Sequence, residues 1–245
     1  MRNIKLTIQY DGTRYSGWQF QKNAKSIQDT IEKAVKTITG KHSRLIGSGR
    51  TDSGVHAKAQ VANFKTNSKI PLKNIQMALN SALPGDIVIS KIDEVPIDFN
   101  AQHNAVSKLY CYTIYNNDFV DPLIRNFAAK CFYKLDISAM RSSAKFFLGR
   151  HDFKSFQTND GGGEKDTVRT IKEIKIEKRG DLIYIYIEAD GFLYNMVRSI
   201  VGTLIEIGRG KLESDSVKHM LAKRDRRCSG PTVPAKGLCL ISVKY

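Results

Sequence analysis

The first strand and helix of the chain decide its fold. Residues 4–10 (IKLTIQY) alternate apolar and polar side chains, the pattern of a strand with one buried face. Residues 26–38 (SIQDTIEKAVKTI) begin with Ser26, a residue type that caps helices, and place Ile27, Ile31 and Val35 at helical spacing. A strand followed by an amphipathic helix predicts a mixed α and β structure.

The elements that follow complete a first half of the chain. Short strands are expected near residues 44–47 and 58–64. A helix opens at Pro71, and residues 86–95 form the next strand. This half therefore has the order β-α-β-β-α-β.

The second half repeats this order. Its expected elements are a strand at 106–115, a helix at 137–148, a hairpin of 168–178 and 182–189, helices at 193–207 and 214–222, and a strand at 238–245. The fold prediction is α+β, with two ferredoxin-like halves, residues 1–105 and 106–245. Their antiparallel sheets are expected to join in one central sheet with a catalytic cleft.

Composition narrows the class of protein. No stretch of the 245 residues approaches the ~18 apolar residues of a membrane span, and the first residues lack the apolar core of a signal peptide. We therefore expect a cytoplasmic protein with no membrane contact. The cysteines lack C-x-x-C spacing, so reduced, buried thiols are expected rather than zinc ligands or disulfides. They are Cys111, Cys131, Cys228 and Cys239.

Positive charge indicates a polyanionic partner. The net charge is +15, of which +7 lies in residues 1–105 and +8 in residues 106–245. An excess spread over the whole body, without membrane features, favours nucleic acid. On charge alone, a basic protein with a small-molecule substrate stays open.

Residues 47–56 (GSGRTDSGVH) hold the densest cluster of special residues. Three glycines permit a tight loop, and the loop carries Arg50, Asp52 and His56. The segment is not G-x-G-x-x-G, and the chain has no Walker-type phosphate loop, so a nucleotide cofactor is disfavoured. A loop carboxylate beside an arginine suits nucleophilic work, and a structural Arg–Asp turn is the alternative.

Residues 49–57 (GRTDSGVHA) resemble the active-site motif of the tRNA pseudouridine synthase A family, which usually reads GRTDAGVHA. Ser53 replaces the common alanine, a change between small residues. Other blocks that resemble the family follow in order along almost the whole chain. They are residues 10–12 (YDG), Tyr15, 17–19 (GWQ), 26–28 (SIQ), Asn80, 83–87 (LPGDI), Tyr110, Tyr112, 151–153 (HDF), 191–198 (GFLYNMVR) and 234–238 (PAKGL).

The resemblance implies roles for five residues. Asp52 matches the catalytic aspartate, a nucleophile; whether it attacks the sugar C1′ or the base C6, or drives elimination, stays open. Arg50 and Arg198 match arginines that keep this carboxylate ionised and can hold a phosphate. Tyr110 matches a tyrosine that stacks on the target base and is a candidate to help remove the C5 proton. Leu238 matches a leucine of the base pocket. Without the resemblance, Tyr110 is an ordinary strand tyrosine and Leu238 is core.

The implied activity is isomerisation of uridine to pseudouridine in tRNA, at positions 38 to 40 of the anticodon stem-loop. The reaction is redox-neutral, so no cofactor, metal or nucleotide is expected. The implied partners are tRNA and a second copy of the chain in a homodimer. The target base must leave its stack, a cost that an aromatic ring and a basic groove can offset.

Two departures from the family leave the RNA target open. Where members commonly read Phe-His-Ala-Arg, residues 99–102 read FNAQ, so Gln102 cannot supply a positive charge. Lys108 stands where arginine is frequent and loses bidentate geometry. A paralogous synthase that acts on other RNA sites is therefore an alternative.

Two rivals come from other classes. A non-catalytic RNA-binding protein is one alternative, although it would not need Asp52. A nucleoside hydrolase or glycosylase is the other, and it would release free uracil.

Three further features have plainer interpretations. The pair His151 and Asp152 is expected to stabilise a turn. The run 223–227 (KRDRR) is either an RNA contact or a solvated helix end. Residues 161–163 (GGG) are expected in a mobile loop.

Overall fold

The computed structural model describes residues 1–119, 121–158 and 166–245, and its contacts form two compact units. The first contains Met1–Val106 with Cys239–Tyr245, and the second contains Ser107–Leu238. The final strand, expected with the second half, is thus grouped with the first unit, and the division at residue 105 stays a prediction. The glycine run 161–163 lies outside the described residues.

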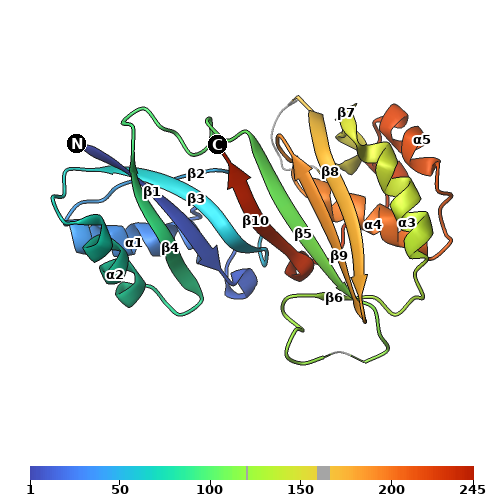
Figure 1. Cartoon of the computed structure of the whole chain (residues 1–245), viewed down its shortest axis with the longest axis horizontal. Helices are drawn as coiled ribbons and strands as arrows, with labels where there is room; N and C mark the ends of the chain where they lie inside the picture. The colour runs from blue at the N-terminus through green and yellow to red at the C-terminus, as the bar shows by residue number, and fades with distance from the viewer. Residues whose placement is uncertain (120, 159–165) are drawn as a thin grey trace. The chain divides into compact units, whose positions relative to one another are not determined.

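The first unit has the strand and helix order that the sequence predicts (Figure 1). Its elements are β1 (Arg2–Tyr10), α1 (Ile27–Thr39), β2 (Ile46–Gly47), β3 (His56–Thr66), α2 (Leu72–Ala82) and β4 (Ile87–Val95), with a 3-10 turn η1 (Gly12–Arg14) after β1. Strands β4, β1, β3 and β2 pair in that order, all antiparallel. Strand β10 (Leu238–Lys244) pairs with β3 in parallel through Cys239 and His56.

The predicted periodicities explain the core of this unit. Ile4, Leu6 and Ile8 alternate along β1 and are fully buried. The helix α1 buries Ile27 and Ile31 and contacts α2. Removing such side chains from water is the main favourable contribution to folding. The predicted cap is confirmed, because the Ser26 hydroxyl accepts a hydrogen bond from the Asp29 amide at 3.2 Å.

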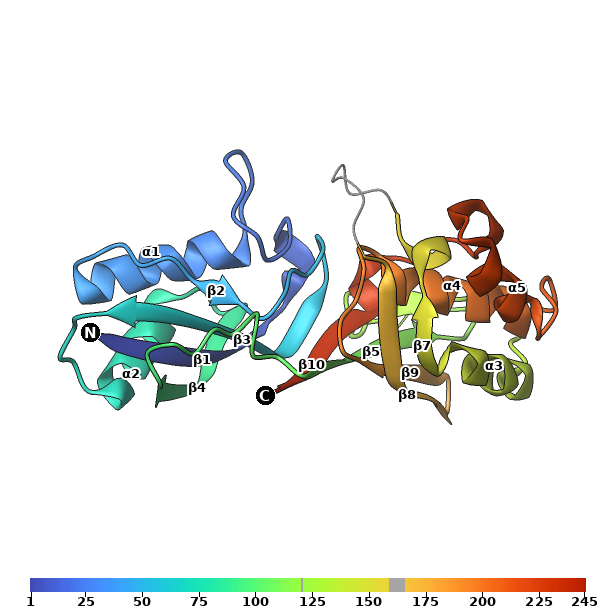
Figure 2. The same cartoon turned by 90° about the horizontal axis from the view of Figure 1, so that it is seen from above.

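The second unit contributes mostly antiparallel strands to the ten-stranded sheet, and its helices lie on one face of these strands. Its elements are β5 (Ser107–Tyr115), β6 (Ala129–Lys130), α3 (Ile137–Ala144), β7 (Gly149–Asp152), β8 (Val168–Arg179), β9 (Leu182–Ala189), α4 (Met196–Gly208) and α5 (Ser216–Lys223). The strands pair in the order β5, β9, β8 and β7, with β6 parallel to β5. Figure 2 shows α3, α4 and α5 on the same side of this sheet.

The predicted α+β class is confirmed, and the differences are local. The helix expected to reach residue 148 ends at Ala144 and continues as a 3-10 turn over Lys145–Phe147. The helix expected from residue 193 begins at Met196, because Asn195 has a left-handed φ of 61°. Strands β6 and β7 were not predicted. None of the four cysteines, all within the described ranges, forms a disulfide, but only Cys111 and Cys131 are buried.

Candidate functional site

Asp52 lies on the loop between β2 and β3, in the first unit. Its side chain is half-buried, whereas Thr51 before it and Val55 after it are buried. The carboxylate is thus carried by a loop whose neighbouring residues are anchored in the core. A site that must hold a reacting group in one geometry needs such support.

Tyr10 and Trp18 hold Thr51 from two sides. The hydroxyl of Tyr10, at the end of β1, lies 2.8 Å from the buried Thr51 hydroxyl. Burial raises the pKa of Tyr10 well above its ordinary value, so this hydroxyl stays protonated. The Trp18 amide donates to the Thr51 carbonyl at 3.0 Å. Both bonds fix the residue directly before Asp52.

Tyr15 holds the other side of the loop. Its carbonyl accepts hydrogen bonds from the Ser53 hydroxyl at 3.2 Å and from the Gly54 amide at 3.3 Å. The ring hydroxyl of Tyr15 donates to the Asp86 carboxylate at 2.5 Å. The residues on both sides of Asp52 are therefore bonded to the segment after β1.

Two glycines allow the loop to approach this segment closely. A Cβ on Gly12 would lie 2.0 Å from the Val55 carbonyl oxygen, and one on Gly17 would lie 2.4 Å from the Thr51 carbonyl oxygen. Gly17 also has a φ of +89°, which L side chains rarely adopt. No other residue fits either position without displacement of the loop. We call residues 10–18 the cradle of the Asp52 loop.

His56 joins the cradle at the start of β3. Its Nδ1 lies 3.1 Å from the Gly12 amide nitrogen and 3.1 Å from Asp11 Oδ1. It accepts from Gly12 when unprotonated and donates to Asp11 when protonated. Burial raises the pKa of Asp11, but hydrogen bonds from Thr13 and the His56 charge outweigh it and lower that pKa below its usual range. His56 thus helps to position the cradle.

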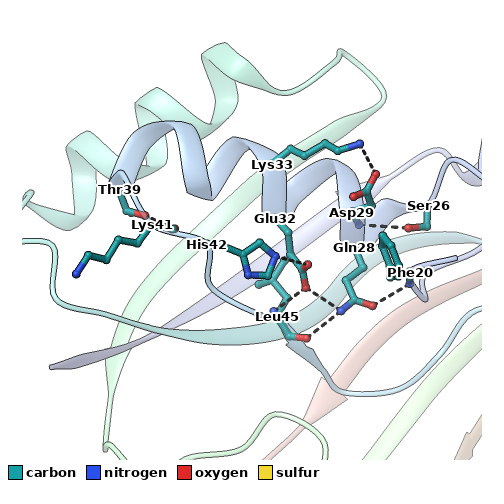
Figure 3. A network of polar contacts seen from close by, with 10 residues as sticks. All are labelled: Phe20, Ser26, Gln28, Asp29, Glu32, Lys33, Thr39, Lys41, His42 and Leu45. Atoms are coloured by element: carbon teal, nitrogen blue, oxygen red, sulfur yellow. Dashed lines mark hydrogen bonds and ion pairs between the residues drawn. The ribbon is translucent and has the colours of Figure 1, made fainter. Parts of the chain in front are cut away.

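A polar network on α1 holds the segment after the cradle and the approach to β2 (Figure 3). Gln28 Oε1 accepts from the Phe20 amide at 3.0 Å, and Gln28 Nε2 donates to Glu32 Oε1 at 2.8 Å. The same Glu32 oxygen accepts from the Leu45 amide at 2.9 Å. Glu32 Oε2 lies 3.4 Å from His42 Nε2. The network therefore fixes the chain on both sides of α1, including the approach to β2 and the Asp52 loop.

Arg50 is exposed on the same loop. Within the part of the chain that the structure describes, it forms no ion pair with Asp52 or any other carboxylate. The alternative of a structural Arg–Asp turn therefore gains no support. An exposed guanidinium on the rim of the loop remains able to bind a phosphate.

Tyr110 lies on β5 in the second unit. Its ring is buried and meets the Phe192 ring edge to face, with centroids 5.1 Å apart. Phe192 belongs to the loop between β9 and α4, so the loop holds the tyrosine ring in one orientation. A ring held in this way can serve as a platform for a base.

Arg198 lies in the first turn of α4, and backbone and side-chain acceptors orient its guanidinium. Its Nε donates to the Val233 carbonyl at 2.7 Å, and its Nη1 donates to Asn195 Oδ1 at 2.7 Å. Asn195, the left-handed residue before α4, is itself held by a bond from its Nδ2 to the Thr158 hydroxyl at 2.6 Å. The conformation that delays the helix start thus also positions Arg198.

Leu238 is buried at the start of β10 and belongs to the second unit. The segment before it packs on β5. The Tyr112 hydroxyl donates to the Pro234 carbonyl at 2.8 Å, and a Cβ on Gly237 would lie 2.6 Å from the Tyr112 ring. Residues 234–238 are therefore placed beside the strand that carries Tyr110.

The five predicted site residues divide between the units. Asp52 and Arg50 lie in the first, and Tyr110, Arg198 and Leu238 lie in the second. The sequence missed the cradle contacts of Tyr10, Gly12 and Gly17, although all three lie in blocks that resemble the family. The clustered glycines were the available signal for a close approach.

Asp152 has structural partners, as expected for a turn stabiliser. Its carboxylate accepts from the Thr167 hydroxyl at 2.7 Å and from the Lys154 amide at 2.9 Å, and it pairs with Arg224 Nε at 2.7 Å. Arg226, in the basic run 223–227, donates to the Gly230 carbonyl at 2.9 Å. Structural bonds therefore engage part of that run, and RNA contact by it stays a prediction.

The two departures from the family differ in their surroundings. Gln102 is exposed, and its backbone N–H donates to Asn100 Oδ1 in a turn. Lys108 is half-buried at the start of β5. The described residues contain no group of three or more His, Cys, Asp or Glu side chains that could hold a metal ion.

No helix in the described ranges is long and apolar enough to cross a membrane.

Comparison with known proteins gives consistent matches. A family model described as tRNA pseudouridine synthase matches residues 6–104 and 143–245. The tRNA pseudouridine synthase A 2 of Clostridium perfringens is 53% identical over 245 residues, covering 100% of both chains. The tRNA pseudouridine synthase A of Acetivibrio thermocellus is 50% identical, again covering 100% of both chains.

Among solved structures, the crystal structure of a Cbf5-Nop10-Gar1 complex aligns with 97% of this chain and 58% of that chain. The TM-score is 0.41 and the identity 10%, a likeness that carries no argument about function.

Proposed function

The chain belongs to the tRNA pseudouridine synthase A family, and from this premise we propose that it is an isomerase that converts uridine to pseudouridine in tRNA. The reaction breaks the bond between C1′ and N1 of uridine and joins C1′ to C5 of the same base. The C5 proton is then lost and N1 is protonated. No electrons are gained or lost, so the reaction needs no redox cofactor.

The observation that carries this proposal is the anchored Asp52 loop. Tyr10, Tyr15 and Trp18 hold the residues on both sides of Asp52, while the carboxylate itself is only half-buried. A carboxylate fixed in this way can attack an electron-poor carbon or stabilise positive charge on the sugar. We assign Asp52 the role of nucleophile, which attacks either the sugar C1′ or the base C6. An elimination driven by the carboxylate is the third alternative.

The second unit supplies candidate groups for the base and the backbone. Tyr110, held edge to face by Phe192, is assigned to stack on the target base and to assist removal of the C5 proton. Arg198, already oriented by Val233 and Asn195, is assigned to keep the Asp52 carboxylate ionised or to bind a phosphate. Arg50 is assigned to bind a phosphate. Leu238 is assigned to the apolar wall of the base pocket.

The partners we propose are tRNA and a second copy of the chain. The charge of +15 per chain suits a polyanion, and a homodimer would double it on a surface large enough for an anticodon arm. The proposed targets are positions 38 to 40 of that arm, and the proposed location is the cytoplasm. A paralogous synthase with other RNA targets remains the alternative, because Gln102 and Lys108 depart from the usual residues.

The direct test uses purified protein, unmodified tRNA transcripts and EDTA. We expect pseudouridine, detected by chemical labelling because its mass equals that of uridine. Release of free uracil as the main product would overturn the proposal in favour of a glycosylase. Binding of tRNA with no change in the RNA would favour a non-catalytic RNA-binding protein.

A further inference from the structure

Lys108 presents a half-buried positive charge with no counter-ion among the residues that the structure describes. It lies at the start of β5, directly opposite Ala189 of β9. Throughout residues 1–119, 121–158 and 166–245, its ammonium group forms neither a hydrogen bond nor an ion pair. Burial lowers the pKa of Lys108, and the positive charge of Arg169 lowers it further.

Arg169 lies on the same face of the second unit's sheet. Lys108 and Ile171 both lie directly opposite Ala189 of β9, so these three side chains share a face. Arg169 is two residues from Ile171 on β8, and side chains two residues apart on a strand share a face. Arg169 Nη1 donates to the backbone carbonyls of Asp166 and Val168. Among the described residues, no carboxylate forms an ion pair with Arg169. Its Nε and Nη2 therefore remain able to donate to a ligand.

The two cations lie close to the Tyr110 platform. Lys108 and Tyr110 are two residues apart on β5 and share a face. Arg169 packs against Gly191, where a Cβ would lie 3.3 Å from its Nε, and Gly191 precedes the Phe192 that contacts Tyr110. One end of this sheet face thus combines an aromatic platform with two positive charges.

Two neighbouring positive charges of this kind are unfavourable in the protein without a bound anion. A partly desolvated ammonium beside a second cation destabilises the fold unless an opposite charge arrives. Groups held against their electrostatic preference tend to mark functional sites. An anionic ligand would supply that opposite charge.

We infer that Lys108 and Arg169 form a phosphate-binding site for the substrate RNA, next to the base that stacks on Tyr110. The inference rests on the proposed function, which makes a flipped base and its adjacent phosphodiester the ligands at this place. A lysine meets a phosphate as a point charge, and the arginine offers two donors from its remaining nitrogens. Lys108 lacks the second donor nitrogen of the arginine that is common at its position, and Arg169 supplies that donor to the phosphate.

The test compares tRNA binding with stability in four variants. Lys108→Gln and Arg169→Gln remove one charge each from the site, and Lys108→Arg keeps it. Lys178→Gln, at the far end of β8, is the matched control because it lowers the net charge equally. All four are made in an Asp52→Asn background so that the RNA stays unmodified. Affinity for an unmodified tRNA transcript is measured from about 50 to 200 mM salt, with a thermal melt of each free protein.

We expect Lys108→Gln and Arg169→Gln each to weaken binding roughly tenfold and to reduce the salt slope by about one. The Lys108→Arg variant should bind as the parent does. Lys108→Gln should not lower the melting temperature, because it removes a repelled, desolvated charge. A purely structural lysine would give the opposite result for stability.

The inference is overturned if Lys108→Gln binds like Lys178→Gln, or if it unfolds at lower temperature with an unchanged salt slope. Its failure is distinct from failure of the proposed function. Wild-type protein that makes pseudouridine while the Lys108 and Arg169 variants bind normally would refute only this site. A weakened, less salt-dependent interaction in both variants supports the site whether or not turnover is found.

Discussion

Replacing Gly17 by alanine should separate the positioning of Asp52 from the stability of the fold. The added Cβ would lie 2.4 Å from the Thr51 carbonyl oxygen and 3.1 Å from the Asp52 carbonyl carbon. Gly40→Ala is the matched control, because Gly40 also has a positive φ, +74°, but nothing lies within 4 Å of its added Cβ. Both changes strain the backbone, and only the first pushes on the loop.

The structure gives the size of both effects. A side chain at positive φ costs about 1–2 kcal/mol, or roughly 2–8 °C in melting temperature for a chain of this size. At Gly17 the contact is also about 1 Å short of the 3.4 Å at which ordinary contact begins, so the loop must move by about that much. A 1 Å misplacement of a reacting group can slow a reaction ~100-fold. We therefore expect Gly17→Ala to lose about two orders of magnitude in turnover.

The assay is single-turnover formation of pseudouridine in a tRNA transcript, at a temperature where both variants are folded. Gly40→Ala should react at the wild-type rate in spite of its lower melting temperature. Equal rates for Gly17→Ala and Gly40→Ala would refute the reasoning that the cradle positions Asp52. A loss of tRNA affinity that accounts for the whole effect of Gly17→Ala would refute it as well.

Three further changes test other parts of the account. Tyr110→Phe should keep tRNA affinity but slow single turnover, whereas Tyr110→Ala should also weaken binding roughly tenfold; equal rates for Phe and wild type would reduce Tyr110 to a stacking platform. Glu32→Ala should cost about 1–3 kcal/mol in urea unfolding, because it leaves the buried Leu45 amide without its acceptor; an unchanged midpoint would contradict the buried network. Burial raises the pKa of Asp152, but bonds from Thr167 and Lys154 and the charge of Arg224 bring it below the usual 3.8. A carboxyl group whose pKa is lowered in the folded protein stabilises the fold at pH values above its ordinary pKa. Asp152→Asn should therefore be less stable than wild type at pH 7. Thermal melts should show this difference in melting temperature shrinking as the pH falls below about 4.

Periodicity predicted most of the fold, because most elements bury one face. Ile4, Leu6 and Ile8 alternate as a half-buried strand must, and they are fully buried in β1. Strand β7 escaped prediction because its residues, Gly149–Asp152, have no apolar alternation and owe their strand form to pairing with β8. The parallel pairing of β10 with β3 joins residues 239 and 56, a contact that local patterns cannot contain.

The site was predictable where one short segment carries the chemistry. The Asp52 loop combines glycines, a cation and a carboxylate within ten residues, and its resemblance to a family motif identifies it. Gly17 and Gly12 were not predicted as supports, because each acts on a segment about 35 to 45 residues away. The charge imbalance at Lys108 likewise depends on its burial beside Arg169, which only the folded chain creates.

The central claim, that Asp52 drives uridine isomerisation in tRNA, is tested most directly by mapping pseudouridine in cells. RNA is taken from a strain that lacks this protein and from the same strain carrying either wild-type protein or Asp52→Asn. An amide keeps the shape of the side chain but loses the anionic nucleophile. We expect pseudouridine at tRNA positions 38 to 40 to be absent without the protein, restored by the wild type, and still absent with Asp52→Asn expressed at equal level. Restoration of these sites by Asp52→Asn would contradict the claim.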